Sequence, residues 1–295
     1  MKLIKVLILC GVFFLHALFP SSIQADSSRE PGKLTVIVSS CDKYAELWGG
    51  FFQLLFRNWP ALKDSAQQIP LLLIANNKSY PDPAVKTILI NNEKAWSDNM
   101  LDTLDKVKSE YVLILLEDYY ITKFDEKRFQ EILKYMVENK HISYIELHPE
   151  ISTLEGKAVM VPHLPGARYK GRYEDFRTSL QASLWRKDDL ALLLRRGESA
   201  WAFETQGSIR SQGLRGEFIV MMEQPSIEYL NMAQQGYLNA ENIRKAKALG
   251  VEIKDRSLPL DEDHRVRIWF KITLPRILYF QLVVPCERAF QWIFG

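Results

Sequence analysis

The stretch Tyr-Val-Leu-Ile-Leu-Leu-Glu-Asp-Tyr-Tyr-Ile-Thr, residues 111–122, decides the fold class of this chain. Its first six residues, Tyr111 to Leu116, form a continuous apolar run of strand length. A strand that is apolar on both faces must be covered on both faces, as happens in an α/β sheet. The run therefore predicts a central strand in a sheet flanked by helices.

Two acidic residues, Glu117 and Asp118, follow at once where the apolar run ends. Open α/β sheets bind ligands beyond the carboxyl ends of their strands. Adjacent carboxylates at such a place repel each other unless a cation, a ribose hydroxyl pair or a shared proton compensates their charge. The dipeptide alone fits either a ligand site or a strand that ends in solvated acids.

The composition is that of an ordinary globular protein. The 295 residues are 47% apolar and 25% charged, which is enough for one large domain or two intimate ones. A formal net charge of +2 gives no argument for nucleic acid, and we find neither zinc-type Cys/His spacing nor a phosphate-loop signature. We therefore expect no nucleic-acid partner.

Strand and helix patterns alternate from Leu34 to Leu147, which predicts a mainly parallel sheet with right-handed crossovers. Polar residues at helix starts, Ser97, Asp125 and Ser199, are predicted N-caps. The predicted strands are Leu34–Ser40, Pro70–Ala75, Val85–Ile90, Tyr111–Leu116, Ile142–Leu147, Leu180–Trp185 and Phe218–Met222. The predicted helices are Leu47–Trp59, Trp96–Val107, one after Asp125, Lys187–Arg196, one after Ser199, and Asn239–Leu249.

The two ends of the chain have their own patterns. Lys2 and Lys5 precede an apolar segment and then small residues up to Ala25, which predicts a secretory signal, either cleaved after Ala25 or kept as an anchor. The basic and aromatic tail, 261–295, fits an interfacial membrane helix or a helix packed on the domain. We therefore divide the chain at 1–25, 26–150, 151–260 and 261–295, and expect an exported or membrane-anchored protein.

Three segments together resemble the GT-A glycosyltransferases, in particular the bacterial family-2-like enzymes that use nucleotide-sugars. They are Val38–Tyr44, Leu115–Tyr119, and Gln181–Trp185 followed by Gly197-Glu198 and Trp201–Glu204. The resemblance covers roughly Leu34 to Tyr229. It implies a GT-A-like, Rossmann-like sheet that is mainly parallel and flanked by helices, with a mixed acceptor-side half and an amphipathic C-terminal tail.

The resemblance also implies how a donor would bind. The nucleotide-sugar would lie across the carboxyl ends of the strands, with Asp42 on the base or ribose and with Ser39 and Tyr44 lining the same pocket. Ser97 belongs to a segment that resembles one near the donor sugar. Asp42 equally fits a turn aspartate, and Ser97 a helix start.

The family's acidic signature has two carboxylates around one residue, whereas this chain has Glu117-Asp118-Tyr119 and lacks the outer acid. By resemblance, Asp118 would bind Mn²⁺ or Mg²⁺, and Glu117 the ribose or a metal-bound water. Basic side chains could also neutralise the departing diphosphate. Those in the loop region after the sheet are Arg168, Lys170, Arg172 and Arg177, which fit a solvated loop face as well.

An inverting transfer needs a carboxylate base, and the resemblance points to Glu198 or Glu204 without separating them. Trp185 and Trp201 could stack on a sugar ring or belong to the core. His148 and His163 could be a third metal ligand or structural residues.

The sequence thus predicts a glycosyltransferase of the hexosyltransferase kind that acts on a glycan, lipid or protein, and that contacts a membrane surface through its tail. The alternative is an exported carbohydrate-binding protein that keeps the scaffold without catalysis. The export signal and the missing acid favour that alternative, while the retained acids count against it. A metal-dependent hydrolase is a third option.

Overall fold

A computed structural model describes residues 33–64, 69–91, 94–148, 159–234, 236–253 and 258–261. All of them belong to the unit Pro31–Gly295. The predicted signal at 1–25 and the tail from residue 262 onward lie outside these residues. In the part of the chain described, no helix is both long and apolar enough to cross a membrane.

Eight strands among the described residues form one sheet in the order β3-β2-β1-β4-β8-β6-β9-β7. β8 runs antiparallel to β4 and β6, and β7 runs antiparallel to β9, while the other pairs are parallel. The mixed, mainly parallel sheet is confirmed. The strands are β1 (Leu34–Ser39), β2 (Leu71–Ala75), β3 (Lys86–Leu89), β4 (Tyr111–Leu116), β6 (Ile142–Glu146), β7 (Ala167–Tyr169), β8 (Ser183–Arg186) and β9 (Glu217–Met221).

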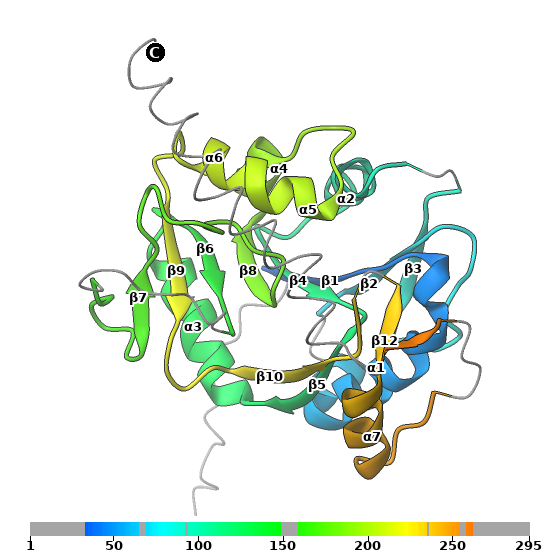
Figure 1. Ribbon diagram of the computed structural model, residues 1–295. Helices are drawn as coiled ribbons and strands as arrows, with labels where there is room; N and C mark the ends of the chain where they lie inside the picture. The colour runs from blue at the N-terminus through cyan, green and yellow to red at the C-terminus, as the bar shows by residue number, and fades with distance from the viewer. Residues whose placement is uncertain are drawn as a thin grey trace, which may run out of the picture. The chain divides into compact units, whose positions relative to one another are not determined.

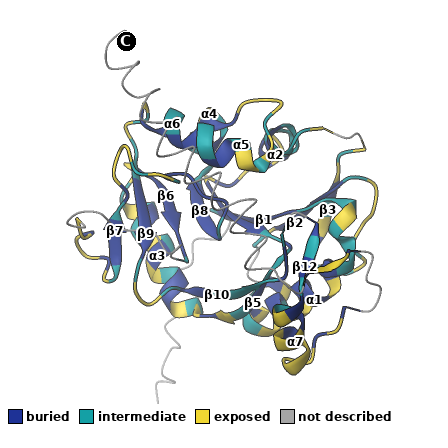
Figure 2. Ribbon diagram, viewed as in Figure 1, coloured by how far each residue is buried: buried dark blue, intermediate teal, exposed yellow. Residues whose placement is uncertain are grey.

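The predicted central strand, β4, lies inside the sheet and is buried on both faces, as its apolar run requires (Figure 2). Tyr111, Leu113 and Leu115 belong to one core cluster, and Val112 and Ile114 belong to the other. On the first face pack α1 (Ala45–Asn58) and α3 (Glu126–Glu138), with α7 (Ala240–Ala248) farther out against β10 and β12, and on the second face pack α2 (Trp96–Leu104), α4 (Lys187–Leu193) and the short α5 (Ala200–Ala202) (Figure 1).

Directly after the acidic pair the chain forms a strand that the sequence analysis did not predict. β5 (Tyr119–Phe124) pairs antiparallel with β10 (Ile227–Asn231) in a separate ribbon, because Tyr120, Ile121 and Phe124 are buried on the α1 side of the core. After β10 the chain enters a separate three-stranded sheet made of β11 (Ala233–Gln234), β12 (Tyr237–Asn239) and β13 (Leu260–Asp261). The β5–β10 ribbon places residues from distant parts of the sequence beside the end of β4.

Two of the three predicted N-caps are confirmed. Asp125 accepts the N–H of Arg128 at the start of α3, and Ser199 accepts the N–H of Ala202 at the start of α5. The prediction for Ser97 is wrong, because α2 begins at Trp96 with Ala95 as its cap. The remaining short elements are η1 (Asp42–Tyr44), η2 (Pro60–Lys63), the π-helical turn η4 (Phe203–Gly207) and α6 (Ser208–Ser211).

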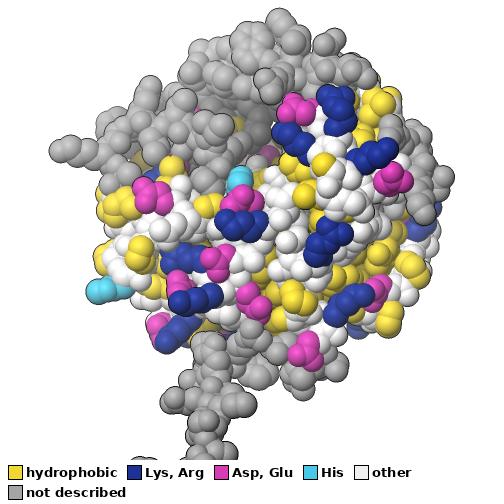
Figure 3. Space-filling view, turned by 90° about the horizontal axis from the view of Figure 1, so that it is seen from below, with side chains coloured by type: hydrophobic (Ala, Val, Ile, Leu, Met, Phe, Trp, Pro, Cys, Tyr) yellow, Lys and Arg dark blue, Asp and Glu magenta, His cyan; other side chains and the backbone are white. Residues whose placement is uncertain are grey.

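The surface charges of the described residues are mixed in sign. Basic and acidic side chains are interspersed on the face seen from below (Figure 3). Lys123 and Glu228, for example, form an exposed ion pair of 2.8 Å across the β5–β10 ribbon. This mixture accords with the small net charge of the whole chain.

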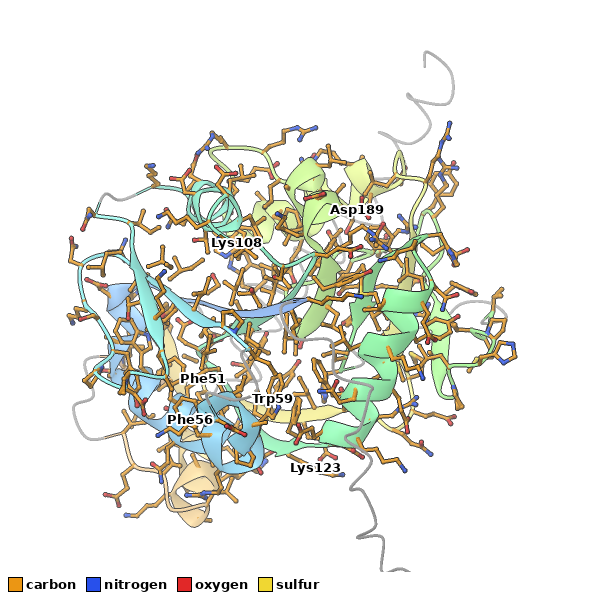
Figure 4. All side chains as sticks on the ribbon, turned by 180° about the vertical axis from the view of Figure 1, so that it is seen from behind. Phe51, Phe56, Trp59, Lys108, Lys123 and Asp189 are labelled. Atoms are coloured by element: carbon orange, nitrogen blue, oxygen red, sulfur yellow. The ribbon has the colours of Figure 1, made fainter. Side chains whose placement is uncertain are left out.

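The contact between α1 and the β5–β10 ribbon is unusually close and aromatic. Trp59, at the end of α1, stacks on Phe124 at a centroid distance of 4.1 Å (Figure 4). The phenol of Tyr120 donates to the carbonyl of Leu47, and a Cβ added to Gly50 would lie 2.5 Å from the Tyr120 oxygen. Gly50 is therefore required by the packing of the helix on the ribbon.

We predict that Gly50→Ala lowers the free energy of unfolding by about 1–3 kcal/mol, because the new methyl overpacks this contact. Gly49→Ala is the matched control: it lies in the same helix, is exposed and meets nothing within 4 Å. That change should stabilise by about 0.5–1 kcal/mol through helix propensity. Urea unfolding measures both, and equal stabilities of the two variants would contradict the close packing.

Candidate functional site

The carboxyl ends of β1, β2 and β4 meet at one edge of the sheet. The register pairs Ser39 of β1 with Leu116 of β4, so the residues that follow, Ser40 and Glu117, emerge side by side. A cavity of about 750 Å³ lies at this edge, and its lining also includes side chains of α2, η4 and β10. Cavities of this size hold cofactors and small ligands in other proteins.

The acidic pair lies in the wall of this cavity and is poorly hydrated. Glu117 is 6% exposed, and burial, followed by the nearby charge of Asp118, raises its pKa well above the ordinary value of 4.5. Burial also raises the pKa of Asp118 from 3.8 to about 7. Within the described residues, Oδ1 of Asp118 is buried without a hydrogen-bond partner. Burial thus raises the pKa of both carboxylates, and one oxygen of Asp118 has no hydrogen-bond partner among the described residues.

This donor set fits a hard divalent cation. Carboxylate oxygens are the ligands of Mg²⁺ and Mn²⁺, and Mg²⁺ characteristically takes one or two carboxylates and fills its shell with water and phosphate oxygens. Groups of three or more His, Cys, Asp or Glu residues able to hold a metal are absent from the described residues. Glu117 and Asp118 would therefore hold an ion that keeps open positions for other ligands.

Asp42 lines the cavity, but its carboxylate is engaged within the protein. It accepts the backbone N–H groups of Asn76, Asn77 and Lys78 at 3.0–3.2 Å, and its own N–H donates to the side chain of Asn76. The carboxylate therefore joins the turn after β1 to the turn after β2. The turn-aspartate alternative describes this residue, and the predicted contact to base or ribose has no support in its hydrogen bonding.

Of the other three predicted donor-binding residues, Ser39 and Tyr44 line the cavity, and Ser97 does not. The hydroxyl of Ser39 accepts the indole N–H of Trp96 at 2.9 Å. Burial and the acidic pair raise the pKa of Tyr44 to about 12, so its phenol stays protonated and can donate. Ser97 is fully buried and accepts the N–H of Glu198 at 2.9 Å, so its predicted donor contact is wrong.

The structure separates the two candidate bases. Glu198 is held by a two-pronged ion pair in which both terminal nitrogens of Arg210 donate at 2.7 Å, and it does not line the cavity. Glu204 lies in the cavity wall, is 9% exposed and accepts the N–H of Leu180 at 3.1 Å. It belongs to the π-helical turn η4, a kind of turn that is frequent at functional sites. Arg210 already neutralises Glu198, so Glu204 is the better placed of the two carboxylates.

The two candidate tryptophans have different places. Trp185 is fully buried and packs on Tyr144 and Phe218, so the prediction that it stacks on a sugar is wrong. Trp201 is 41% exposed and lines the cavity. It can present an aromatic face to a ligand.

The predicted basic group and the histidines do not line the cavity. Arg168 pairs with Glu174, Lys170 pairs with Glu146 at 2.7 Å, and Arg172 and Arg177 donate to carbonyls of the segment after α6 and of α6. His148 contacts the Ile227 carbonyl, and His163 is exposed on a loop. These cations serve internal contacts, and their assistance to a leaving diphosphate stays a prediction.

Among the described residues that line the cavity, the basic side chains are Lys43 and Lys94. Lys43 lies over the Tyr44 ring at 5.8 Å, and Lys94 forms an ion pair with Asp102 at 2.7 Å. The sequence analysis assigned no role to either. Only their position in the sequence could have pointed to them. Lys43 follows Asp42 in the turn after β1, and Lys94 precedes α2 at the same edge of the sheet.

No protein-family model matches the chain, and no curated protein does. Over most of its length the chain is similar to glycosyltransferases of known structure. S. aureus TarS is 13% identical to this chain with a TM-score of 0.47, and the match covers 84% of this chain and 44% of TarS. The chain thus spans less than half the length of that protein.

Mannosyltransferase PcManGT from Pyrobaculum calidifontis, solved with GDP-Man and Mn²⁺, is 13% identical with a TM-score of 0.46, and 88% of this chain and 72% of that chain are covered. S. aureus TarS 1-349 in complex with UDP is 14% identical with a TM-score of 0.47, and the match covers 88% of this chain and 78% of that chain. Likenesses at this level carry no argument about the reaction.

The raised pKa of Asp118 predicts that the stability of the folded protein depends on pH. The pKa of Asp118 is about 7 in the folded protein and 3.8 ordinarily, so the folded state holds the proton more tightly than the unfolded state does. The stability contributed by protonated Asp118 is therefore lost as pH rises from about 4 through 7. Asp118→Asn should therefore raise the unfolding midpoint at pH 8 in the presence of a chelator and change it little near pH 4. Glu228→Gln, at the exposed ion pair, is the control. Equal effects of Asp118→Asn at both pH values would contradict the buried, uncompensated charge.

Proposed function

We propose that this protein is a glycosyltransferase that moves a sugar from a nucleotide-sugar donor to a hydroxyl group of a glycan, lipid or protein acceptor. The observation that carries the proposal is the Glu117–Asp118 pair in the wall of a 750 Å³ cavity at the carboxyl ends of the strands, with Glu117 buried and Oδ1 of the half-buried Asp118 shielded from solvent. A carboxylate pair in this state favours a cation, and a cation beside a cavity of this size favours a diphosphate.

In this proposal Asp118, assisted by Glu117, holds a divalent ion. When bound, the ion supplies positive charge that neutralises a diphosphate group. Lys43 and Lys94 add positive charge from the cavity lining. Tyr44 offers a protonated hydroxyl beside the acids, where it can donate to a phosphate or ribose oxygen. These side chains bind and orient the donor.

Glu204 acts as the base on the wall formed by η4. It takes the proton of the acceptor hydroxyl as the acceptor oxygen bonds to the anomeric carbon of the sugar. The bond from that carbon to the diphosphate oxygen breaks in the same step, and the nucleoside diphosphate leaves with the electron pair. Attack from the face opposite the leaving group inverts the sugar's configuration. Trp201, at the same cavity, offers an aromatic face to a sugar ring.

We predict that the segment Asp26–Gly295 binds a nucleoside diphosphate in isothermal titration calorimetry only when Mn²⁺ is present. UDP and GDP are the first probes, since the similar structures hold UDP and GDP-Man. Asp118→Asn should lose the Mn²⁺-dependent part of the binding, because it removes an ionic ligand. Absence of binding by any nucleoside diphosphate would contradict the proposal.

Two further variants sharpen this test. Glu204→Gln should keep nucleotide binding and lose transfer by about 10²–10⁴-fold, the usual contribution of a general base. Glu228→Gln, on the exposed surface, should change neither. Sugar binding without transfer in the unaltered protein would indicate the carbohydrate-binding alternative, and donor breakdown without an acceptor product would indicate a hydrolase.

A further inference from the structure

Two buried hydroxyl groups converge on the main chain of the turn that carries Glu204. Thr178 is fully buried and Ser208 is 3% exposed, and their hydroxyl oxygens lie 3.1 Å apart. The Ser208 hydroxyl donates to the carbonyl of Glu204 at 2.6 Å. The Thr178 hydroxyl lies 3.4 Å from the same carbonyl and 3.4 Å from the carbonyl of Phe203. Buried networks of this kind, when satisfied, fix a single local conformation.

The carbonyl of Glu204 belongs to the π-helical turn η4. Such a turn spaces its main-chain bonds five residues apart instead of four, and it is rare and frequent at functional sites. A hydroxyl that donates to the carbonyl four residues before it competes with the α-helical bond to that carbonyl. Ser208 makes such a bond to Glu204, so its hydroxyl favours the wider turn over a regular α-helix.

The turn also packs directly on Thr178. A Cβ added to Gly207, the last residue of η4, would lie 3.0 Å from the ring of Phe203 and 3.1 Å from the Thr178 hydroxyl oxygen. Phe203 is fully buried, and its ring packs on Trp96 of α2 at a centroid distance of 5.3 Å. The turn is therefore packed between α2 and the segment that carries Thr178.

The segment that holds the main chain of Glu204 also holds its carboxylate. Leu180, two residues after Thr178, donates its N–H to Oε1 of Glu204 at 3.1 Å. Leu180 and Glu204 line the cavity, whereas Thr178 and Ser208 do not. The two hydroxyls can therefore act on a ligand only through the position of Glu204.

We propose that Thr178 and Ser208 are positioning residues that hold η4 as a π-helical turn and thereby keep the Glu204 carboxylate at the cavity. This inference rests on the proposed function, because it requires Glu204 to be the base. Without the two hydroxyls the turn can shift towards a regular α-helix. The carboxylate then moves along the wall, and a misplacement of about 1 Å can cost about 10²-fold in rate.

The test measures transfer of sugar from UDP-glucose, UDP-N-acetylglucosamine and GDP-mannose, with Mn²⁺, to a mixture of lactose and octyl glucoside. Thr178→Val keeps the shape of the side chain without the hydroxyl and should lower kcat by about tenfold to a hundredfold. The affinity for UDP and GDP in calorimetry should not change, because Thr178 does not line the cavity. Ser208→Ala should behave in the same way, whereas Thr178→Ser, which keeps a hydroxyl, should keep most of the rate.

Thr35→Val is the matched control for the loss of a buried hydroxyl. The Thr35 hydroxyl accepts that of Ser109 at 2.8 Å, and both residues are buried. Thr35 lies near the start of β1, at the end of the strand away from the cavity. This variant should lower the unfolding temperature about as much as Thr178→Val and leave kcat unchanged. An equal loss of kcat in both variants would overturn the inference.

A double variant separates positioning from general damage. If Thr178 acts through Glu204, adding Thr178→Val to Glu204→Gln should cause no further loss, because the base that it positions is already absent. Losses that multiply would show that Thr178 supports the protein independently of Glu204, and they would overturn the inference.

The two failures are distinguishable. If Glu204→Gln slows transfer and neither Thr178→Val nor Ser208→Ala does, the inference is wrong and the proposed function stands. If the unaltered protein transfers none of these sugars, the proposed function fails and the positioning role of the two hydroxyls fails with it.

Discussion

The site depends on the cost of holding two adjacent carboxylates at the dry end of the central strand. The register of β1 with β4 fixes Glu117 beside Ser40, and burial raises the pKa of Glu117 and Asp118. Proteins seldom keep an uncompensated buried charge without a use for it. The cavity lies beside this charge, the protonated phenol of Tyr44 is near it, and a cationic ligand would relieve it.

Elsewhere the protein pairs its buried charges internally. Lys170 with Glu146, Arg168 with Glu174 and Arg210 with Glu198 are pairs of 2.7 Å that bind loops to the sheet and to α6. Such pairs fix geometry and leave no charge for a ligand. The contrast separates the structural acids from Glu117, Asp118 and Glu204, which line the cavity.

The sequence predicted well what depends on local pattern. The apolar run of β4, the order of the first strands and the caps Asp125 and Ser199 follow from periodicity and capping chemistry, and all are confirmed. The place of the acidic pair at the edge of the sheet follows from the direction of the strand.

What the sequence did not show are contacts between residues that are distant in sequence. Arg210 neutralises Glu198, Tyr144 and Phe218 enclose Trp185, and β10 turns the segment after Asp118 into a strand. No local pattern shows these contacts.

The most direct test of this account is the effect of Mn²⁺ on the unfolding temperature of the free protein at pH 8, without nucleotide. The account predicts a saturable rise over the value in chelator, because an ion that binds only the folded state stabilises it. The rise should disappear in a Glu117→Gln/Asp118→Asn double variant whose own midpoint in chelator is no lower than that of the unaltered protein. An unfolding temperature that does not respond to Mn²⁺ or Mg²⁺ would contradict the claim that the carboxylate pair is a cation site.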